Sequence, residues 1–373
     1  MKVYDAASIR NIALVGHGGS GKTQLVSALL LASGAVNRLG KVDDGSTVTD
    51  YDDESIARKH TLGSSLAYLE WRRQKVNVVD TPGFSNFLAD ARAALRVTEG
   101  VLLCVDAVSG VEVQTERMWA ETRHLGLPRL VVVTRLDRER ASMDRTMESI
   151  QRCCGRDAVP TQIPLGEEGG FTGVIDLVGM KAFEFDGGGT GRMTEVTIPG
   201  HLETRASAAR DALIERVAEA DESLIETFFS QGTLSQEQLV QGLKASTASG
   251  RLVPALCTSG LHVIGCQPLL DAVIDYVPSP AERPFPVTTS TGEPATMPAE
   301  WPVSMNIPAL PATIFSRIGE KPSSCGIAAL AVSSSQVGMY QSARRRWKIA
   351  SSKNIQNHAT KNITSDAMNR IIP

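Results

Sequence analysis

The sequence predicts an α/β protein: a P-loop, doubly wound, mostly parallel sheet that carries an inserted α+β subdomain. Two observations predict this fold. Between residues 9 and 276, short apolar runs alternate with helix-length amphipathic stretches, the pattern of βαβ units with helices on both faces of a sheet. The first apolar run leads directly into the glycine-rich segment GHGGSGKT at 16–23, which opens an amphipathic stretch.

The strands and helices of the sheet follow from length and residue type. Short runs rich in branched residues predict parallel strands at 12–15, 76–79, 101–105, 130–133 and 252–256. Residues 65–71 join the second of these runs through a turn and are predicted as an antiparallel edge strand. Helices are expected at 22–31, 87–97, 115–125, 141–153 and 268–276.

A subdomain is predicted between Asp137 and Cys257, because this segment is far longer than a single crossover needs. Its first part is strand-like, at 161–164, 172–175, 181–185 and 195–198. Its second part is helical, at 202–217, 222–229 and 235–245. We therefore expect an insertion over residues 158–250.

The end of the chain has a different composition. Seven of the 18 prolines fall between Pro278 and Pro302, which predicts a linker without regular structure. From Gln341 onward, seven Lys or Arg residues stand against Asp366 alone, and for this tail we favour disorder. Residues 284–373 are thus predicted to be a proline-rich linker and an unassigned tail.

Bulk composition excludes several classes of protein. A net charge of −3 gives no overall attraction to nucleic acid or to an anionic membrane. No stretch approaches the roughly 20 apolar residues of a membrane span, and the N-terminus lacks a signal sequence. Six cysteines without ligand spacing argue against a metal centre or a disulfide framework. We expect a cytoplasmic protein with no membrane partner.

The segment at 16–23 matches the phosphate-binding pattern GxxxxGK(S/T). Its glycines let backbone N–H groups turn inward around phosphates, Lys22 reaches the β and γ phosphates, and Thr23 offers a ligand for Mg²⁺. A structural or solvent-facing role is favoured for His17 over contact with the γ phosphate. The predicted nucleotide-binding residues are Gly16, His17, Gly18, Gly19, Ser20, Gly21, Lys22 and Thr23.

Two further loops belong to the phosphate end of this site. Asp80 ends a predicted strand, where its carboxylate can hold Mg²⁺ through water, and the N–H of Gly83 can meet the γ phosphate. Thr61 lies in a long polar segment that resembles a mobile, metal-binding switch loop; an ordinary exposed loop is the alternative. Lys22, Thr61 and Gly83 are the candidate catalytic residues, and Thr23, Thr61 and Asp80 the candidate metal ligands.

The base is predicted to be guanine. Asp137 follows a predicted strand, and its carboxylate can accept two hydrogen bonds from guanine that adenine cannot supply. Arg135 can stack on the base, whereas Thr134 places a hydroxyl where GTP switches have an amide. A surface Arg/Asp pair at a strand end is the alternative. Backbone N–H groups after the last strand can contact the guanine oxygen, from Cys257, Ser259 and Gly260. The implied cofactors are GTP or GDP with Mg²⁺.

With these loops, and with segments 86–101, 106–115 and 267–280, the sequence resembles bacterial elongation factor G, and more closely an elongation-factor-G-like paralogue, over residues 9–280. The resemblance implies a translation GTPase that docks on the ribosome and serves elongation or ribosome recycling. It also implies a GTP-binding domain over 1–157 and 251–283, interrupted by the insertion at 158–250. We expect a monomer.

Three departures from that family bear on function. Phe84 stands where the family has the histidine that orients the attacking water, which predicts slow intrinsic hydrolysis. Gly19 replaces an acidic residue that the family has in its phosphate loop. Nothing after Val303 resembles the β-barrel that follows in the family, and for this reason we hypothesise a truncation or a frame shift. A GTP sensor with little hydrolysis and an inactive fragment remain alternatives. An ATP-using P-loop enzyme is opposed by Asp137.

Overall fold

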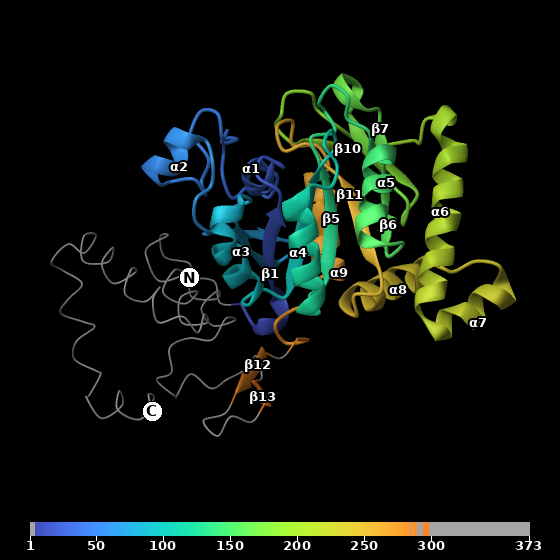
Figure 1. Ribbon diagram of the computed structural model, residues 1–373. Helices are drawn as coiled ribbons and strands as arrows, with labels where there is room; N and C mark the ends of the chain where they lie inside the picture. Colours follow the sequence, from blue (N-terminus) through green and yellow to red (C-terminus); the bar gives the residue numbers. More distant parts are fainter. Residues whose placement is uncertain (1–3, 284, 289–293, 298–373) are drawn as a thin grey trace. The chain divides into compact units, whose positions relative to one another are not determined.

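The computed structural model describes residues 4–283, 285–288 and 294–297, which fall within one compact unit (Figure 1). Its centre is a seven-stranded sheet with the order β2-β3-β1-β4-β5-β11-β6. Only β2 runs antiparallel to its neighbour in this sheet. The strands are β1 (Ile9–Gly16), β2 (Ser65–Trp71), β3 (Gln74–Asp80), β4 (Gly100–Asp106), β5 (Arg129–Thr134), β6 (Ala158–Pro160) and β11 (Val253–Cys257). The predicted α/β class is confirmed.

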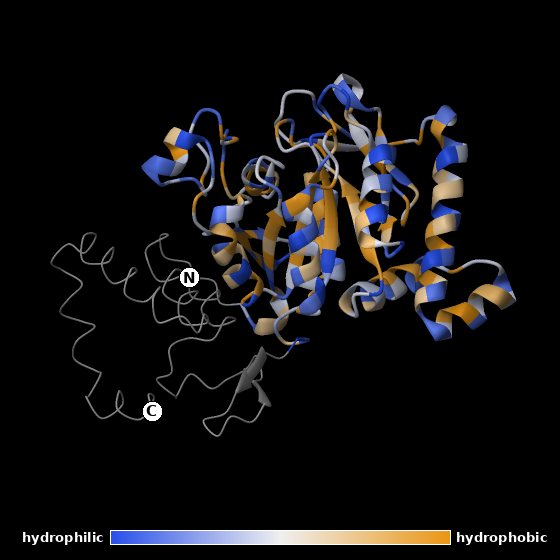
Figure 2. Cartoon of the chain, viewed as in Figure 1, coloured by the Kyte–Doolittle hydropathy of each residue, from blue (hydrophilic) through white to orange (hydrophobic). Residues whose placement is uncertain are grey.

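Helices cover both faces of the central sheet, whose strands are mostly apolar (Figures 1 and 2). On one face, α1 (Lys22–Ala32) and α9 (Cys266–Tyr276) close a core cluster with Ile12 and Leu14 of β1. The opposite face is covered by α3 (Leu88–Leu95), α4 (Val113–His124) and α5 (Met143–Cys154). All eight residues of β1 are buried, as expected for a central parallel strand.

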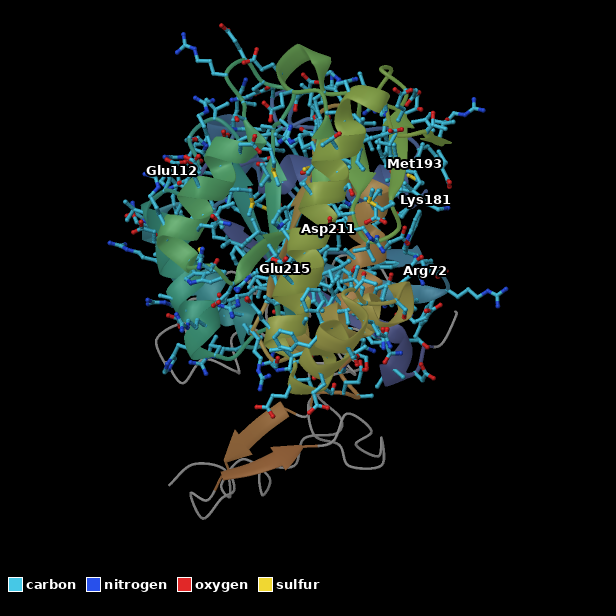
Figure 3. All side chains as sticks on the ribbon, turned by 90° about the vertical axis from the view of Figure 1, so that its right-hand side faces the viewer. Arg72, Glu112, Lys181, Met193, Asp211 and Glu215 are labelled. Carbon is cyan, nitrogen blue, oxygen red and sulfur yellow. The ribbon has the colours of Figure 1, made fainter. Side chains whose placement is uncertain are left out.

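The insertion forms a second sheet with its own helices. Its four antiparallel strands have the order β10-β9-β8-β7 and comprise β7 (Gln162–Leu165), β8 (Gly173–Asp176), β9 (Lys181–Phe185) and β10 (Met193–Val196). Three helices follow: α6 (Gly200–Ala220), α7 (Glu222–Gln231) and α8 (Gln236–Ala248). Helix α6 buries Leu213 and Val217, whereas Asp211 and Glu215 lie on its exposed side (Figure 3). The amphipathic pattern of the sequence therefore places α6 against the insertion core.

Two elements outside the second sheet and its helices were not expected. β6 (Ala158–Pro160) pairs in parallel with β11, so these residues extend the large sheet although the sequence placed them in the insertion. α2 (Asp53–Arg58) occupies the polar segment that was expected to be a loop; Asp52 caps it by accepting from the N–H of Glu54. Short 3-10 turns lie at Ala6–Ser8, Ser85–Phe87 and Glu168–Gly170.

The proline-rich segment contains a hairpin that the sequence did not predict. β12 (Phe285–Thr288) and β13 (Pro294–Met297) pair antiparallel, with Pro286 opposite Thr296. In a two-stranded ladder every second N–H points away from the partner, so proline is tolerated at those positions. The linker prediction is wrong for these strands, while the predicted tail lies outside the described residues. No helix in the described part is long and apolar enough to span a membrane.

The parallel strands end together at one edge of the sheet. Leu14 is opposite Asp80, Gly16 opposite Cys104, and Asp106 opposite Thr134 in the strand register. This edge is where open α/β sheets bind ligands, because the connecting loops converge there. The sequence-predicted site residues therefore come from loops that share one edge.

Candidate functional site

The loop between β1 and α1 has the backbone geometry of an anion cradle. Gly16, Gly19 and Gly21 have φ values of 146°, 82° and 83°, which side chains rarely tolerate. A Cβ at Gly16 would collide with the carbonyl oxygen of Cys104 on the neighbouring strand. Helix α1 begins immediately afterwards, so its free N–H groups point toward the same space. The loop can therefore surround a phosphate group.

Lys22 folds back over this loop. Its side chain is buried, and its ammonium donates to the carbonyl oxygens of Gly16 at 3.2 Å and His17 at 2.6 Å. Burial lowers the pKa of Lys22, while the Asp80 carboxylate acts in the opposite direction. A Cβ at Gly83 would collide with the backbone of His17 and Gly18 as well as with the Lys22 ammonium, so only glycine fits there. Lys22 and the Gly83 backbone thus lie at the mouth of the loop.

Hydroxyl and carboxylate oxygens gather beside Lys22. The hydroxyls of Thr23 and Thr61 are 2.8 Å apart, although 38 positions separate them in the chain. Thr61 also donates to Asp50 at 3.0 Å. Asp80 accepts from Thr49 at 2.9 Å through one carboxylate oxygen, and its other oxygen is buried without a partner. These hard oxygen donors suit Mg²⁺, and the free oxygen of Asp80 is available to a metal or its bound water.

Burial penalises the charge on this cluster. Asp80 is fully buried, which raises its pKa to about 6 against the opposing effects of the nearby Thr23 and Thr49 hydroxyls. Burial also raises the pKa of Asp50. Two carboxylates that are both disfavoured as anions would be stabilised by a divalent cation between them and the phosphates.

Asp137 has the features of a base-reading residue. Its side chain is only 12% exposed, and one carboxylate oxygen is buried without a hydrogen-bond partner. The other oxygen lies 3.8 Å from the Nε2 atom of His262. A buried acceptor without a donor is costly, and a ligand that carries two N–H groups would satisfy it.

Thr134 and Arg135 connect the base side of the site to the phosphate loop. The Thr134 hydroxyl lies 2.7 Å from the carbonyl oxygen of Ser20 and 3.1 Å from that of Val105. The short hydroxyl thus braces the phosphate loop itself. Arg135 has a left-handed φ of 60° and donates to Asp106 at 2.8 Å, and its stem passes beside Gly21.

After β11, the three predicted residues Cys257, Ser259 and Gly260 offer backbone rather than side chains to the site. The Cys257 thiol points into the protein, 3.7 Å from the Met143 sulfur and 3.8 Å from the Gln162 carbonyl oxygen. Ser259 is buried and accepts from the N–H of His262 at 3.2 Å. Gly260 packs against the first turn of α1, and Gln24 donates to its carbonyl oxygen at 3.2 Å. The Cys257 and Ser259 side chains are thus engaged within the protein, while His262 of the same loop lies beside Asp137.

His17 faces away from the cluster around Lys22. Its Nε2 atom lies 3.3 Å from Glu112, which lines an open pocket together with Gly18, Gly19, Asp106, Ser109 and Arg135. The Nδ1 atom of the same ring is buried without a hydrogen-bond partner, and the structural or solvent-facing role of His17 stays a prediction.

Sequence reasoning missed Asp50, Thr49 and Asp106. Asp106 ends β4 as Asp80 ends β3, so the rule that strand ends converge could have found it. Asp50 and Thr49 lie in a polar segment without a recognisable pattern, and only the folded chain brings them to Thr61 and Asp80. Within the described residues no cluster of three or more His, Cys, Asp or Glu could hold a metal, so any ion here would depend on the threonines.

Comparisons with known proteins agree with this geometry. Residues 7–279 match the family model described as the elongation factor Tu GTP binding domain. A crystal structure of a protein from Thermus thermophilus is similar to this chain, with 36% sequence identity and a TM-score of 0.69. The match covers 75% of this chain and 42% of that protein, so this chain spans less than half the length of that relative.

Proposed function

We propose that this chain binds GTP with Mg²⁺ and hydrolyses it as a translation factor, because it belongs to the elongation factor Tu GTP-binding domain family of P-loop GTPases. One observation carries the proposal. Asp137, with a buried oxygen that lacks a donor, and the loop that holds Lys22 lie at the same sheet edge and are joined through the hydroxyl of Thr134. A single guanosine triphosphate can therefore contact both.

Each predicted residue takes a role in this proposal. Lys22 and the backbone of residues 16–21 bind the β and γ phosphates, and the Gly83 N–H faces the γ phosphate. Thr23, Thr61 and Asp80 hold Mg²⁺ directly or through water, and the ion neutralises charge on the phosphates. Asp137 accepts from the guanine N1–H and amino group. Arg135 and the backbone of Cys257, Ser259 and Gly260 enclose the base.

The ribosome is the proposed partner, with elongation or ribosome recycling as the step served. This part rests on the family and on the resemblance of the sequence to elongation factor G. A cytoplasmic monomer is the state that we propose. A second function, GTP sensing with little hydrolysis, is favoured by Phe84, because its hydrocarbon ring cannot hydrogen-bond to water.

The test is a binding and turnover experiment on the full chain. Labelled GTP, GDP and ATP are titrated in the presence of Mg²⁺, and phosphate release is then followed with and without ribosomes. We expect guanine nucleotides to bind, ATP not to bind, and ribosomes to accelerate release. Lys22→Ala should abolish binding, and the matched surface variant Lys181→Ala, on β9, should leave it unchanged. Equal affinity for GTP and ATP would refute the assignment of Asp137.

A further inference from the structure

Two rings meet at the phosphate loop. A Cβ at Gly18 would lie 2.8 Å from the Phe84 ring, so this ring covers the loop backbone. The imidazole of His60 also lies against Phe84, with ring centroids 4.7 Å apart and planes tilted by 53°. Phe84 follows Gly83 directly, and Gly83 is in contact with the Lys22 ammonium. His60 therefore lies beside the position of a γ phosphate held by Lys22.

The backbone fixes His60 in this position. Helix α2 ends at Arg58, Lys59 adopts a left-handed φ of 54°, and the His60 N–H donates to the Ser55 carbonyl oxygen at 3.1 Å. The next residue is Thr61, whose hydroxyl is 2.8 Å from that of Thr23. The capped helix end thus places an imidazole and a candidate metal ligand at adjacent positions.

Hydrolysis needs a polar group that Phe84 cannot supply. Water attacks the γ phosphorus in line with the leaving oxygen, and a side chain that hydrogen-bonds to this water orients it. Thr61 is engaged with Thr23 and Asp50. His17 is directed to Glu112, on the side of the open pocket. His60, whose ring packs on Phe84 itself, carries a polar group that can hold this water.

We propose that His60 orients the attacking water during GTP hydrolysis, with Phe84 as the apolar wall against which its ring packs. The inference rests on the proposed GTPase function. The water oxygen forms the new bond to the γ phosphorus, and the bond from that phosphorus to the bridging oxygen breaks with its electron pair left on GDP. The water proton passes to the released phosphate. Because His60 precedes Thr61, water can be oriented only when this segment is in place over the nucleotide.

The test separates binding from the chemical step. GTP affinity is measured first, and phosphate release is then followed in single turnovers with ribosomes present. We expect His60→Ala to lower the rate about 100-fold, since the attacking water loses the side chain that hydrogen-bonds to it. GTP affinity should change less than about threefold because the base and phosphate contacts remain. His60→Gln should recover part of the rate, since an amide can also orient water. His124→Ala, on the exposed end of α4, is the matched control.

A double variant tests the geometry itself. His60→Ala combined with Phe84→His returns an imidazole to the same place from the other loop, and we expect it to restore at least about a tenth of the wild-type rate. A wild-type rate in His60→Ala would overturn the inference while leaving GTP binding intact. So would a wild-type protein that binds GTP but releases no phosphate with ribosomes. If the wild type binds no GTP at all, the proposed function fails at the first measurement.

Discussion

Changing Asp137 to asparagine should reverse the base preference of the site. In the structure one carboxylate oxygen of Asp137 is buried without a partner, and the side chain is 12% exposed, so a bound base would be held in a largely dry environment. The amide of the Asp137→Asn variant replaces one acceptor with an NH₂ donor that faces the donors of guanine. Xanthine carries an oxygen in place of the guanine amino group and can accept from that donor.

The magnitude follows from the two hydrogen bonds involved. Hydrogen bonds to a charged group contribute about 1.5–3 kcal/mol each. The variant loses one of them, removes the charge from the other and sets two donors face to face, so GTP binding should weaken by about 3 kcal/mol or more. At about 1.4 kcal/mol per factor of ten, GTP affinity should fall by at least about 100-fold. Affinity for xanthosine triphosphate should exceed that for GTP in the variant.

The assay is competitive displacement of a fluorescent guanine nucleotide by GTP and by xanthosine triphosphate. Asp144→Asn is the matched control, since Asp144 is exposed and pairs with Arg205 at the surface. Affinity for GTP within about threefold of wild type in Asp137→Asn would refute the interpretation of the orphaned oxygen as the base contact. A fall in affinity that is equal for all nucleotides would refute it as well, because it would indicate a general disturbance of the loop.

Three further predictions concern stability and the supports of the site. Burial raises the pKa of Glu99 to about 7, and in the folded chain it accepts from Asn11 at 2.7 Å. Its contribution to stability is therefore present below pH 4.5, its ordinary pKa, and is lost as pH rises to about 7. Glu99→Gln should raise the free energy of unfolding above pH 7 by up to about 3 kcal/mol in urea titrations, with no gain near pH 4, whereas exposed Glu148→Gln should change little. Thr134→Val removes the hydroxyl near the Ser20 carbonyl oxygen and should weaken GDP and GTP equally, by about 1–3 kcal/mol in calorimetry; a selective loss of GTP would contradict the bracing role. Cys257→Ser should lower the thermal midpoint and leave nucleotide affinity unchanged, because the thiol faces Met143; weaker GTP binding would place the side chain in the site instead.

Local physical chemistry was enough to predict most of the secondary structure and which loops meet at the candidate site. The strands could be predicted because a strand buried on both faces must be a short, nearly continuous apolar run, and β4 and β5 are of this kind. The conformation of the phosphate loop could be predicted from its glycines, because few other residues tolerate a φ near 80°. Asp80, Thr134 and Asp137 were found since each lies at or just beyond the end of such a strand.

Short or proline-containing elements escaped the sequence for equally physical reasons. β6 has three residues, too few for any periodicity, and it forms because β11 offers a free edge. α2 has six residues and depends on its cap at Asp52. In β12 and β13 the prolines argued against strands, but a hairpin leaves outward positions where no N–H is needed.

The sequence by itself determined which residue types stand at each strand end, because backbone sterics and burial act over a few neighbouring residues. Only the tertiary structure decided which residues of different loops and elements meet. The hydroxyl of Thr134 reaches Ser20 across 114 positions, Thr61 reaches Thr23 across 38, and His60 meets Phe84 from a different loop. Packing also decided that the thiol of Cys257 points toward Met143 and away from the site. Such contacts depend on how the whole sheet and its helices pack, and no local pattern in the chain encodes them.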